Sequence, residues 1–569
     1  MGLPLLLMGL LTFAAFAQTS YMPTREVKAG MRGKGFTVFS GNKVEAFDAE
    51  ILGVLENAGP RQSIILARLS GGPLRHTGVM QGMSGSPVYV NERLIGAVAL
   101  AFTLSKDPIA GIRPFEEMLE AQARPPNLRA SLETPPAQQF TWGDAKLTDI
   151  ATPLSFSGFT AASIEHFSPQ LRALGLEPRQ GMTGGGGSTH PPGDPASLKP
   201  GSMISVQLIS GDLSVAADGT VTHIEGKRIY AFGHRFVSLG DVEMPFAGAE
   251  VLTLLPNLAT SFKISTARGW LGSITQDHST ALRGELGRKA HTVPLSIEIK
   301  GGARLSNYRM ELVRNPALTP FLLQMSAFSA IDATERTLGG VAFKVRQRIE
   351  FENAPPVHAA NIYSGEFNIP QLAAQSGAIP LSYAMQSGFP ELAIKGVQLD
   401  IESFPTRKQV MIEEVTLGRR TVRPGDTVTL QIAFATEGRR FTRNAAYRVP
   451  EGAPSGTLNF TISDALISNF MEFRQYVMTP PRTPAQVLRL LHALRDNTSA
   501  YVRVWRPLPS YQSQGEDLPD PPPSAANLLG RSQGASYIPN YNSKVTEIAV
   551  PLRDYMVSGT RNVSVEVKE

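Results

Sequence analysis

Short segments of β-strand character recur along the first half of the chain, each bounded by glycine, proline or asparagine. Early examples are FTVFSG, SIILARL, SPVYV and LIGAVAL, and later ones are MISVQLISG, GTVTHIEG and RIYAFGH. Segments of this length that are rich in β-branched and aromatic residues, with turn residues between them, are typical of strands. The sequence therefore predicts a mainly β fold, in which the strands between residue 27 and about residue 119 belong to a β-barrel.

Length and composition narrow the class of protein further. The chain has 569 residues, several times the usual size of one domain, so about three or four folded units are expected. It contains no cysteine, which excludes disulfides, catalytic thiols and thiolate metal sites. The net charge of +5 is small, and basic residues do not gather with aromatic ones, so we predict no nucleic-acid partner. The histidines show no metal-ligand spacing, so neither a metal nor a cofactor is predicted.

Residues 1–17, MGLPLLLMGLLTFAAFA, are apolar and end in a small-x-small pattern before Gln18. This pattern is typical of a secretory signal peptide, so we predict an exported protein of the periplasm, the cell envelope or the extracellular space. The alternative is a retained anchor, because the segment lacks a positively charged start. No later stretch of about 18 uninterrupted apolar residues predicts a membrane span.

A serine-containing hexapeptide carries the first chemical signal. Residues 82–87 read GMSGSP and precede two predicted strands. In a serine peptidase the nucleophile sits on a tight turn, where its own amide and that of the residue two before it form an oxyanion hole. Here Ser84 would be the nucleophile, and Gly82 and Ser84 would supply the amides. The alternative, a nucleophile elbow of the α/β-hydrolase kind, would need glycine at position 86 and a helix afterwards. This chain has Ser86 and then a predicted strand, so that alternative is disfavoured. Taken alone, such a hexapeptide is more often an ordinary β-turn.

The wider sequence resembles a known family. The resemblance extends over GMRGKGFTVFSG, EAFDAEILGVL, ILARLSGG, TGVMQGMSGSPVYVNERLIGAVAL and SKDPIAGIRPFEEML, and over PGSMISVQLISGDLSVAADGTVTHIEGKRIYAFGHRF. These segments, roughly the first half of the mature chain, resemble the stage IV sporulation protein B (SpoIVB) serine peptidase family. The resemblance implies a trypsin-like serine peptidase domain, with Ser84 as nucleophile and His234 as general base.

The order of the two motifs departs from the family's arrangement. The histidine segment precedes the serine segment in the family, whereas here His234 follows Ser84. We therefore expect a circular permutation, which can preserve the site because triads are defined by geometry and not by chain order.

The sequence leaves three possibilities for the third catalytic residue. We expect Ser84 and His234 both to be cleft residues, and a carboxylate usually orients such a histidine. Asp48 is the first choice, because it stands in the apolar alternating strand EAFDAEIL, where a buried aspartate needs a partner. Asp277, in the polar turn TQDHST, is the alternative. A dyad of Ser84 and His234 without an acid is the third possibility.

Helix and strand signals extend beyond the peptidase-like region. Helices are predicted near residues 168–174, over 320–336 with Thr319 and Pro320 at the start, and after Thr483 and Pro484. Strict alternation of Val428, Leu430, Ile432 and Phe434 predicts a half-buried antiparallel strand. A glycine run at residues 184–187 lacks the lysine and the helix of a phosphate-binding loop.

The resemblance implies a circularly permuted, trypsin-like double β-barrel, and the later helix and strand signals predict α+β and immunoglobulin-like β-sandwich segments after it. The predicted segments after the signal peptide are 18–125 with the serine, 126–200 as a bridge with the Gly-rich loop, 201–300 with the histidine, 301–405 as α+β, 406–480 as the immunoglobulin-like sandwich, and 481–569 with a helix, a Pro-rich linker and a β tail.

The functional prediction is an exported serine endopeptidase that cleaves protein or peptide substrates through an acyl-enzyme. The alternative, from another class, is a catalytically inactive peptidase-like protein that binds or scaffolds in the cell envelope. In either case the C-terminal β domains are expected to offer a surface for an envelope partner.

Overall fold

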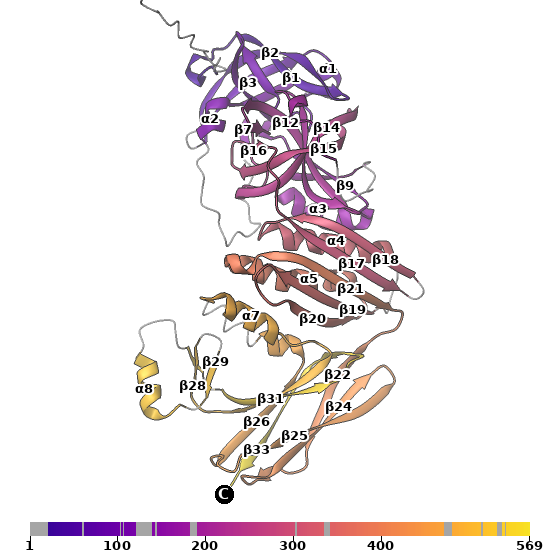
Figure 1. The fold of residues 1–569 in the computed structure, drawn as a ribbon, viewed down its shortest axis with the longest axis vertical. Coiled ribbons are helices and arrows are strands. Elements are labelled where there is room, and N and C mark those ends of the chain that lie inside the picture. Colours follow the sequence, from indigo (N-terminus) through magenta and orange to yellow (C-terminus); the bar gives the residue numbers. More distant parts are fainter. Residues whose placement is uncertain are drawn as a thin grey trace, which may run out of the picture.

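The computed structural model is mainly β, as predicted. Its strands form two large sheets, which follow one another along the long axis of the molecule, and three smaller sheets, which lie together at the C-terminal end (Figure 1). The structure describes residues 21–59, 62–102, 104–105, 107–120, 139–142, 145–181, 191–301, 304–334, 342–470, 481–513, 516–519, 521–531, 538–540 and 542–569. The predicted signal peptide and the Gly-rich loop lie outside these residues.

The first six strands close into a ring, here called the first ring. Every neighbouring pair is antiparallel, and the pairing of β4 with both β1 and β5 completes the circle. Its interior is apolar, with Phe47, Ile65 and Val98 fully buried. Strand β8 (Ala145–Asp149) extends the sheet by pairing with β5, and β7 (Gln139–Trp142) pairs with β8. The ring strands are β1 (Arg32–Ser40), β2 (Lys43–Gly59), β3 (Gln62–Ser70), β4 (Pro87–Val90), β5 (Arg93–Phe102) and β6 (Ile109–Pro114).

A second ring of six antiparallel strands follows. It closes because β12 pairs with both β11 and β13, while β16, β15 and β14 complete the path between them. Strand β9 (Thr152–Ser157) joins β12 from outside, and helix α3 (Ala161–Ala173) leads from it to β10 (Leu176–Gln180). The ring strands are β11 (Met203–Gly211), β12 (Ser214–Glu225), β13 (Arg228–Ala231), β14 (Gly240–Leu255), β15 (Phe262–Asp277) and β16 (Leu282–Leu286).

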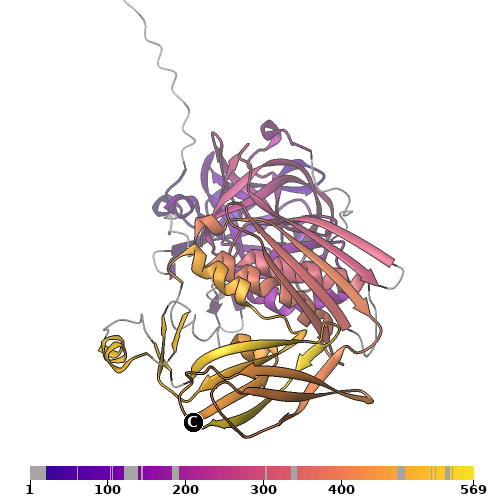
Figure 2. The same cartoon turned by 60° about the horizontal axis from the view of Figure 1, so that its bottom comes forward.

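The second ring continues into a layer of five more strands covered by helices. Strand β18 pairs with β11, so the hairpin of β17 and β18 belongs to the same sheet, and the boundary predicted at residue 300 falls inside this hairpin. Helices α4 (Leu318–Thr334) and α5 (Ile369–Gln386) pack against each other and against these strands (Figure 2). The strands are β17 (Thr292–Gly301), β18 (Arg304–Val313), β19 (Ala342–Phe351), β20 (Val357–Ser364) and β21 (Ile394–Phe404).

The C-terminal region holds two sheets that share one apolar core. One contains β22 (Gln409–Leu417), β24 (Thr427–Thr436), β25 (Arg439–Arg448) and β32 (Met556–Ser558); the other contains β23 (Thr421–Val422), β26 (Gly456–Ser463), β27 (Ser499–Arg506), β31 (Ser543–Pro551) and β33 (Thr560–Val567). The two sheets therefore extend well past the boundary predicted at residue 480. A third small sheet of β28 (Ser510–Ser513), β29 (Glu516–Pro519) and β30 (Ile538–Asn540) lies beside helix α8 (Pro523–Arg531).

The predicted helices are present, and two of them begin earlier than predicted. Helix α7 (Pro484–Ala493) begins where predicted, and the Thr483 side chain accepts a hydrogen bond from the amide of Gln486 at 3.3 Å. Helix α4 is capped earlier than predicted, because Asn315 Oδ1 accepts from the amides of Ala317 and Leu318. Helix α3 includes the predicted segment 168–174 in part, whereas α5 was not predicted. Among the described helices, none is long and apolar enough to cross a membrane.

The two rings are packed against each other. Leu94, Ala97 and Phe115 of the first ring and its following helix α2 (Phe115–Glu120) share an apolar cluster with Tyr230 and Ala281. Arg283 donates hydrogen bonds from the second ring to the carbonyl oxygens at the end of α2. This contact brings the predicted serine and histidine segments to one interface.

Candidate active site

The serine motif forms a tight turn immediately before β4. Gly82 has φ 89° and Gly85 has φ 93°, values in the left-handed region that favours glycine. The amide of Ser86 donates to the carbonyl of Met83 at 2.9 Å, and this bond closes the turn around Ser84. Within the described part of the chain, the amides of Gly82 and Ser84 donate no hydrogen bond.

Strand β12 of the second ring holds this turn in place. Thr220 donates from its amide to the carbonyl of Ser84 at 2.8 Å and from Oγ1 to the carbonyl of Gly82 at 2.9 Å. Thr222 Oγ1 donates to the carbonyl of Gly85 at 2.7 Å. The serine turn therefore belongs to the first ring by sequence and to both rings by its hydrogen bonds.

His234 follows β13 on a bend of unusual backbone geometry. Phe232 has φ 70° and Gly233 has φ 71°, and for a bulky residue such as phenylalanine this conformation is strained. The same bend touches the serine turn, since a β-carbon added at Gly85 would lie 2.5 Å from the amide nitrogen of Phe232. Ser84 and His234 are thus carried by two turns in direct contact.

The hydrogen bond of the imidazole defines its tautomer. Nδ1 of His234 lies 2.6 Å from the carbonyl oxygen of Arg235. A carbonyl oxygen only accepts hydrogen bonds, so Nδ1 carries the proton and Nε2 keeps a free lone pair. Burial lowers the pKa of His234, while the charge of Asp149 and the carbonyl of Arg235 raise it in part. A neutral imidazole with a bare Nε2 is the form that a general base requires.

The expectation that Ser84 and His234 are cleft residues is wrong for this conformation. Ser84 is 0% exposed and His234 is 2% exposed. The Ser84 Oγ and the His234 Nε2 are both buried, and neither makes a hydrogen bond among the described residues. Their burial follows from the contact between the rings, which the strand pattern of either half does not reveal. A buried polar atom without a partner is costly, and a catalytic role is one explanation for such an atom.

Asp48 does not meet the condition on which its prediction depended. Its side chain is exposed, whereas Phe47 and Ala49 on either side are buried. Successive side chains of a strand point to opposite faces, so within β2 the aspartate takes the solvent face. It pairs across the strands with Lys34 and Ser70, and it is not among the charges that act on His234.

Asp277 is buried but serves the backbone. Its carboxylate accepts hydrogen bonds from the amides of Phe236 at 2.8 Å, Val237 at 2.9 Å and Leu239 at 3.1 Å. Burial raises the pKa of Asp277, and these amides lower it in part. Asp277 therefore fixes the loop that follows His234, and its recorded partners do not include the imidazole.

Two charged residues near the site were not singled out from the sequence. Asp149, the last residue of β8, is the acid whose charge raises the pKa of His234. Lys263 is fully buried beside Gly82, and burial lowers its pKa to about 7. Its Nζ donates to Thr37 Oγ1 at 2.8 Å. A single aspartate in a short strand and a single lysine in a long one carry no motif, so only the fold brings them to this place.

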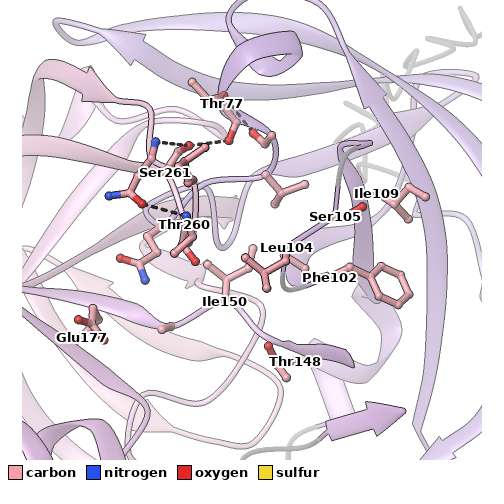
Figure 3. Close-up of a pocket in the computed structure, with 18 of the residues that line it drawn as sticks. Thr77, Phe102, Leu104, Ser105, Ile109, Thr148, Ile150, Glu177, Thr260 and Ser261 are labelled. Atoms are coloured by element: carbon pink, nitrogen blue, oxygen red, sulfur yellow. Dashed lines mark hydrogen bonds between the residues drawn. The ribbon is translucent and has the colours of Figure 1, made fainter. Parts of the chain in front are cut away.

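A cleft of about 300 Å³ lies beside the serine turn and includes Gln81 and Asp149 in its wall. Figure 3 shows Thr260 and Ser261, from the turn between β14 and β15, near Thr77, where Ser261 Oγ donates to the carbonyl of Thr77 at 2.6 Å. Both rings therefore contribute walls. The described residues contain no group of three or more His, Asp or Glu side chains arranged to hold a metal ion.

The comparison with protein families agrees with the resemblance found in the sequence. Residues 16–119 match the family model described as SpoIVB peptidase S55, which confirms the predicted family for this segment and indicates a peptidase. The match contains Ser84 and its turn but ends before β7, so His234 and Asp149 lie outside it. No curated protein matches the chain, and no solved structure matches it either.

Proposed function

We propose that this protein is a serine endopeptidase, in which Ser84 is the nucleophile and His234 the general base. The observation that carries the proposal is the contact between the turn of Ser84 and the bend of His234, each with a buried reactive atom that lacks a hydrogen bond among the described residues. The family match of the segment around Ser84 supports a peptidase.

The arrangement of strands supports a trypsin-like double barrel. Two adjoining rings of six antiparallel strands, with the site at their contact, are the architecture expected of that fold. The serine comes from the first ring and the histidine from the second, so the exchanged order requires no change in geometry. Both rings are complete without residues from the C-terminal sheets.

The proposed reaction is acyl transfer. Ser84 Oγ attacks the carbonyl carbon of a peptide bond while its proton passes to Nε2 of His234. The amides of Gly82 and Ser84 bind the oxyanion. The imidazolium then gives its proton to the leaving amine, the C–N bond breaks, and Ser84 holds the acyl group as an ester. A water molecule gives a proton to Nε2 and attacks the ester carbonyl. The imidazolium then returns that proton to Ser84 Oγ as the ester C–O bond breaks, which releases the acid and restores Ser84 and the neutral His234.

Substrate access requires a conformational change that exposes Ser84 Oγ. Ser84 is fully buried, so a polypeptide cannot reach Oγ in the observed conformation. The cleft lined by Gln81 and Asp149 borders the site from outside, and we assign it to the incoming chain. Lid and domain motions of this kind gate many enzymes on the microsecond to millisecond scale.

Cleavage of an unfolded protein such as casein tests the proposal. Ser84→Ala and His234→Ala are each expected to lower the rate by about 10⁴-fold or more, without loss of folding. Ser86→Ala is the matched control, since Ser86 Oγ is also buried and without a hydrogen bond in the described chain. Full activity in Ser84→Ala, or equal loss in Ser86→Ala, would refute Ser84 as the nucleophile.

A second candidate function is a peptidase-like scaffold without activity, and the complete burial of Ser84 is the observation that favours it. A wild-type protein that never cleaves and never reacts with an organophosphonate would support the scaffold. We further propose export, on the apolar segment 1–17, and an envelope partner for the C-terminal sheets. Detection of the mature protein in a periplasmic or secreted fraction tests the first of these.

A further inference from the structure

The imidazolium of His234 would form in a buried place. A buried cation costs several kcal/mol unless an opposite charge lies near it. Asp48 is exposed and Asp277 accepts hydrogen bonds from the loop backbone, so neither predicted acid fills this role. The charged groups that act on His234 are Asp149, Arg113 and Arg235, and Asp149 is the acid among them.

Strand β5 brings Asp149 to the site. The amide and carbonyl of Val98 bond to the serine turn, through the carbonyl of Ser86 at 2.9 Å and the amide of Gly85 at 2.8 Å. The neighbouring residues Ala97 and Ala99 meet the histidine bend, since a β-carbon added at Gly233 would lie 3.1 and 3.3 Å from their β-carbons.

The same stretch of β5 binds β8. The amide of Ile150 donates to the carbonyl of Ala99 at 2.9 Å, and Asp149 pairs with Leu100. Four consecutive residues of β5, 97–100, therefore contact the serine turn, the histidine bend and the aspartate. This convergence requires both rings and is not visible in the spacing of the sequence.

The three side chains also share an unusual feature. Ser84 Oγ, His234 Nε2 and Asp149 Oδ1 are all buried, and within the described residues none of the three atoms has a hydrogen-bond partner. A buried carboxylate oxygen without a donor is more costly than a neutral group in the same situation. The Asp149 residue as a whole is half-buried and lines the cleft beside the serine turn.

We infer that Asp149 is the positioning carboxylate of His234, held at the junction of β8 and β5 in place of the acid expected at Asp48. The inference rests on the proposed function. The Nδ1–H group of His234 is already bound to the carbonyl of Arg235, so Asp149 acts through its charge and stabilises the imidazolium while the proton is held on Nε2. The positive charges of Arg113 and Arg235 act in the opposite direction and disfavour the imidazolium.

An NMR titration tests this inference without requiring any activity. The Hε1 resonance of His234 is followed against pH in Ser84→Ala, with and without Asp149→Asn, and is assigned by its loss in His234→Gln. Loss of the carboxylate should lower the pKa of His234, by about one pH unit. Asp48→Asn should leave the titration unchanged, and Asp149→Glu should restore it in part. Superimposable titrations of the parent and Asp149→Asn would overturn the inference.

The reaction of Ser84 with a fluorophosphonate gives the second readout. The rate of this reaction is measured against pH. Asp149→Asn should lower the plateau of the pH–rate profile by about 10²- to 10⁴-fold. It should also move the acid limb of the profile to lower pH, because a histidine with a lower pKa stays unprotonated at lower pH. An unchanged plateau and limb in a folded Asp149→Asn protein would refute Asp149 and leave the proposed function intact. A wild-type protein that does not react refutes the proposed function, and the NMR titration then decides on Asp149 alone.

Discussion

Gly85 shows how single residues connect the two rings. A β-carbon at this position would lie 2.0 Å from the carbonyl oxygen of Thr220 and 2.5 Å from the amide nitrogen of Phe232. Both contacts are with backbone atoms of the second ring, which cannot move without separating the rings. The glycine is required here by close approach as well as by its positive φ.

Gly85→Ala is therefore expected to destabilise the protein by more than the cost of its backbone conformation. Gly30→Ala is the control, because Gly30 has φ 84° and open space around it, so it reports the conformational cost alone, about 1 kcal/mol. Urea unfolding should give a loss at least about 2 kcal/mol larger for Gly85→Ala. Equal losses would show that the two rings are not in contact at this turn.

Lys263 gives a prediction about pH. Burial lowers its pKa to about 7 from 10.5, so between these pH values the unfolded chain binds a proton that the folded chain lacks. Stability from this group therefore rises with pH through that window, and the penalty for burying the lysine is complete below pH 7. Lys263→Met removes the penalty, so its advantage over wild type should be largest below pH 7.

That advantage should shrink by roughly 1.4 kcal/mol per pH unit between pH 8 and 9.5, measured by chemical unfolding. Methionine leaves Thr37 Oγ1 without its donor, which shifts the whole curve but not its slope. Lys43→Met replaces an exposed lysine of β2, so the difference in free energy of unfolding between this variant and wild type should not change with pH. A difference in free energy of unfolding that is also independent of pH for Lys263→Met would contradict the lowered pKa.

At the scale of elements, the loop after β13 depends on a side chain from β15. Asp277 binds the backbone amides of Phe236, Val237 and Leu239, and so fixes the direction in which the chain leaves His234. This role is structural, although its loss would also displace the imidazole. The loop has no strand or helix of its own between Ala231 and Gly240 to hold it.

Asp277→Asn replaces one acceptor oxygen by a donor that faces those amides. We expect a loss of about 2–4 kcal/mol in the free energy of unfolding, because charged hydrogen bonds are lost and buried amides are left without acceptors. Asp48→Asn should change stability by less than about 0.5 kcal/mol, as for an exposed site. The reverse order of the two losses would restore Asp48 as the buried acid.

The elements differ in how well the sequence predicts them. Strand β24 was predicted from alternation because Val428, Leu430, Ile432 and Phe434 all face one core, and α7 was predicted because Thr483 and Pro484 mark its start. Helix α5 was missed because Gly377 and Pro380 interrupt its pattern, and packing against α4 compensates. Alternation also explains why Asp48 is exposed and not buried as predicted, since the apolar residues beside it face inward while it faces solvent.

At the scale of the whole molecule, the proposed site lies where the two rings meet. Ser84 and its flank were predictable from a local motif, and His234 from its family resemblance. The inferred role of Asp149 was not predictable, because this residue comes near the two turns only through the pairing of β8 with β5. A carboxylate placed by strand pairing has no signature in sequence spacing.

The rings should therefore depend on each other to fold. A fragment of residues 21–149 exposes the cluster of Leu94, Ala97 and Phe115 and loses the bonds from Thr220 and Thr222 to the serine turn. We expect it to bind a hydrophobic dye and to unfold without a cooperative transition in urea. A fragment of residues 21–404 contains both rings and should unfold cooperatively. A monomeric, cooperatively unfolding fragment 21–149 would contradict the shared core.

The central claim is that Ser84 and His234 form one acyl-transfer site at the contact of the rings. Peptide mapping by mass spectrometry after reaction with an organophosphonate tests it most directly, because the adduct identifies the nucleophile and its rate reports the base. We predict one adduct, on Ser84, that forms in wild type and Ser86→Ala and is lost in His234→Ala. An adduct on another residue, or an adduct on Ser84 that forms as fast in His234→Ala as in wild type, would contradict the claim.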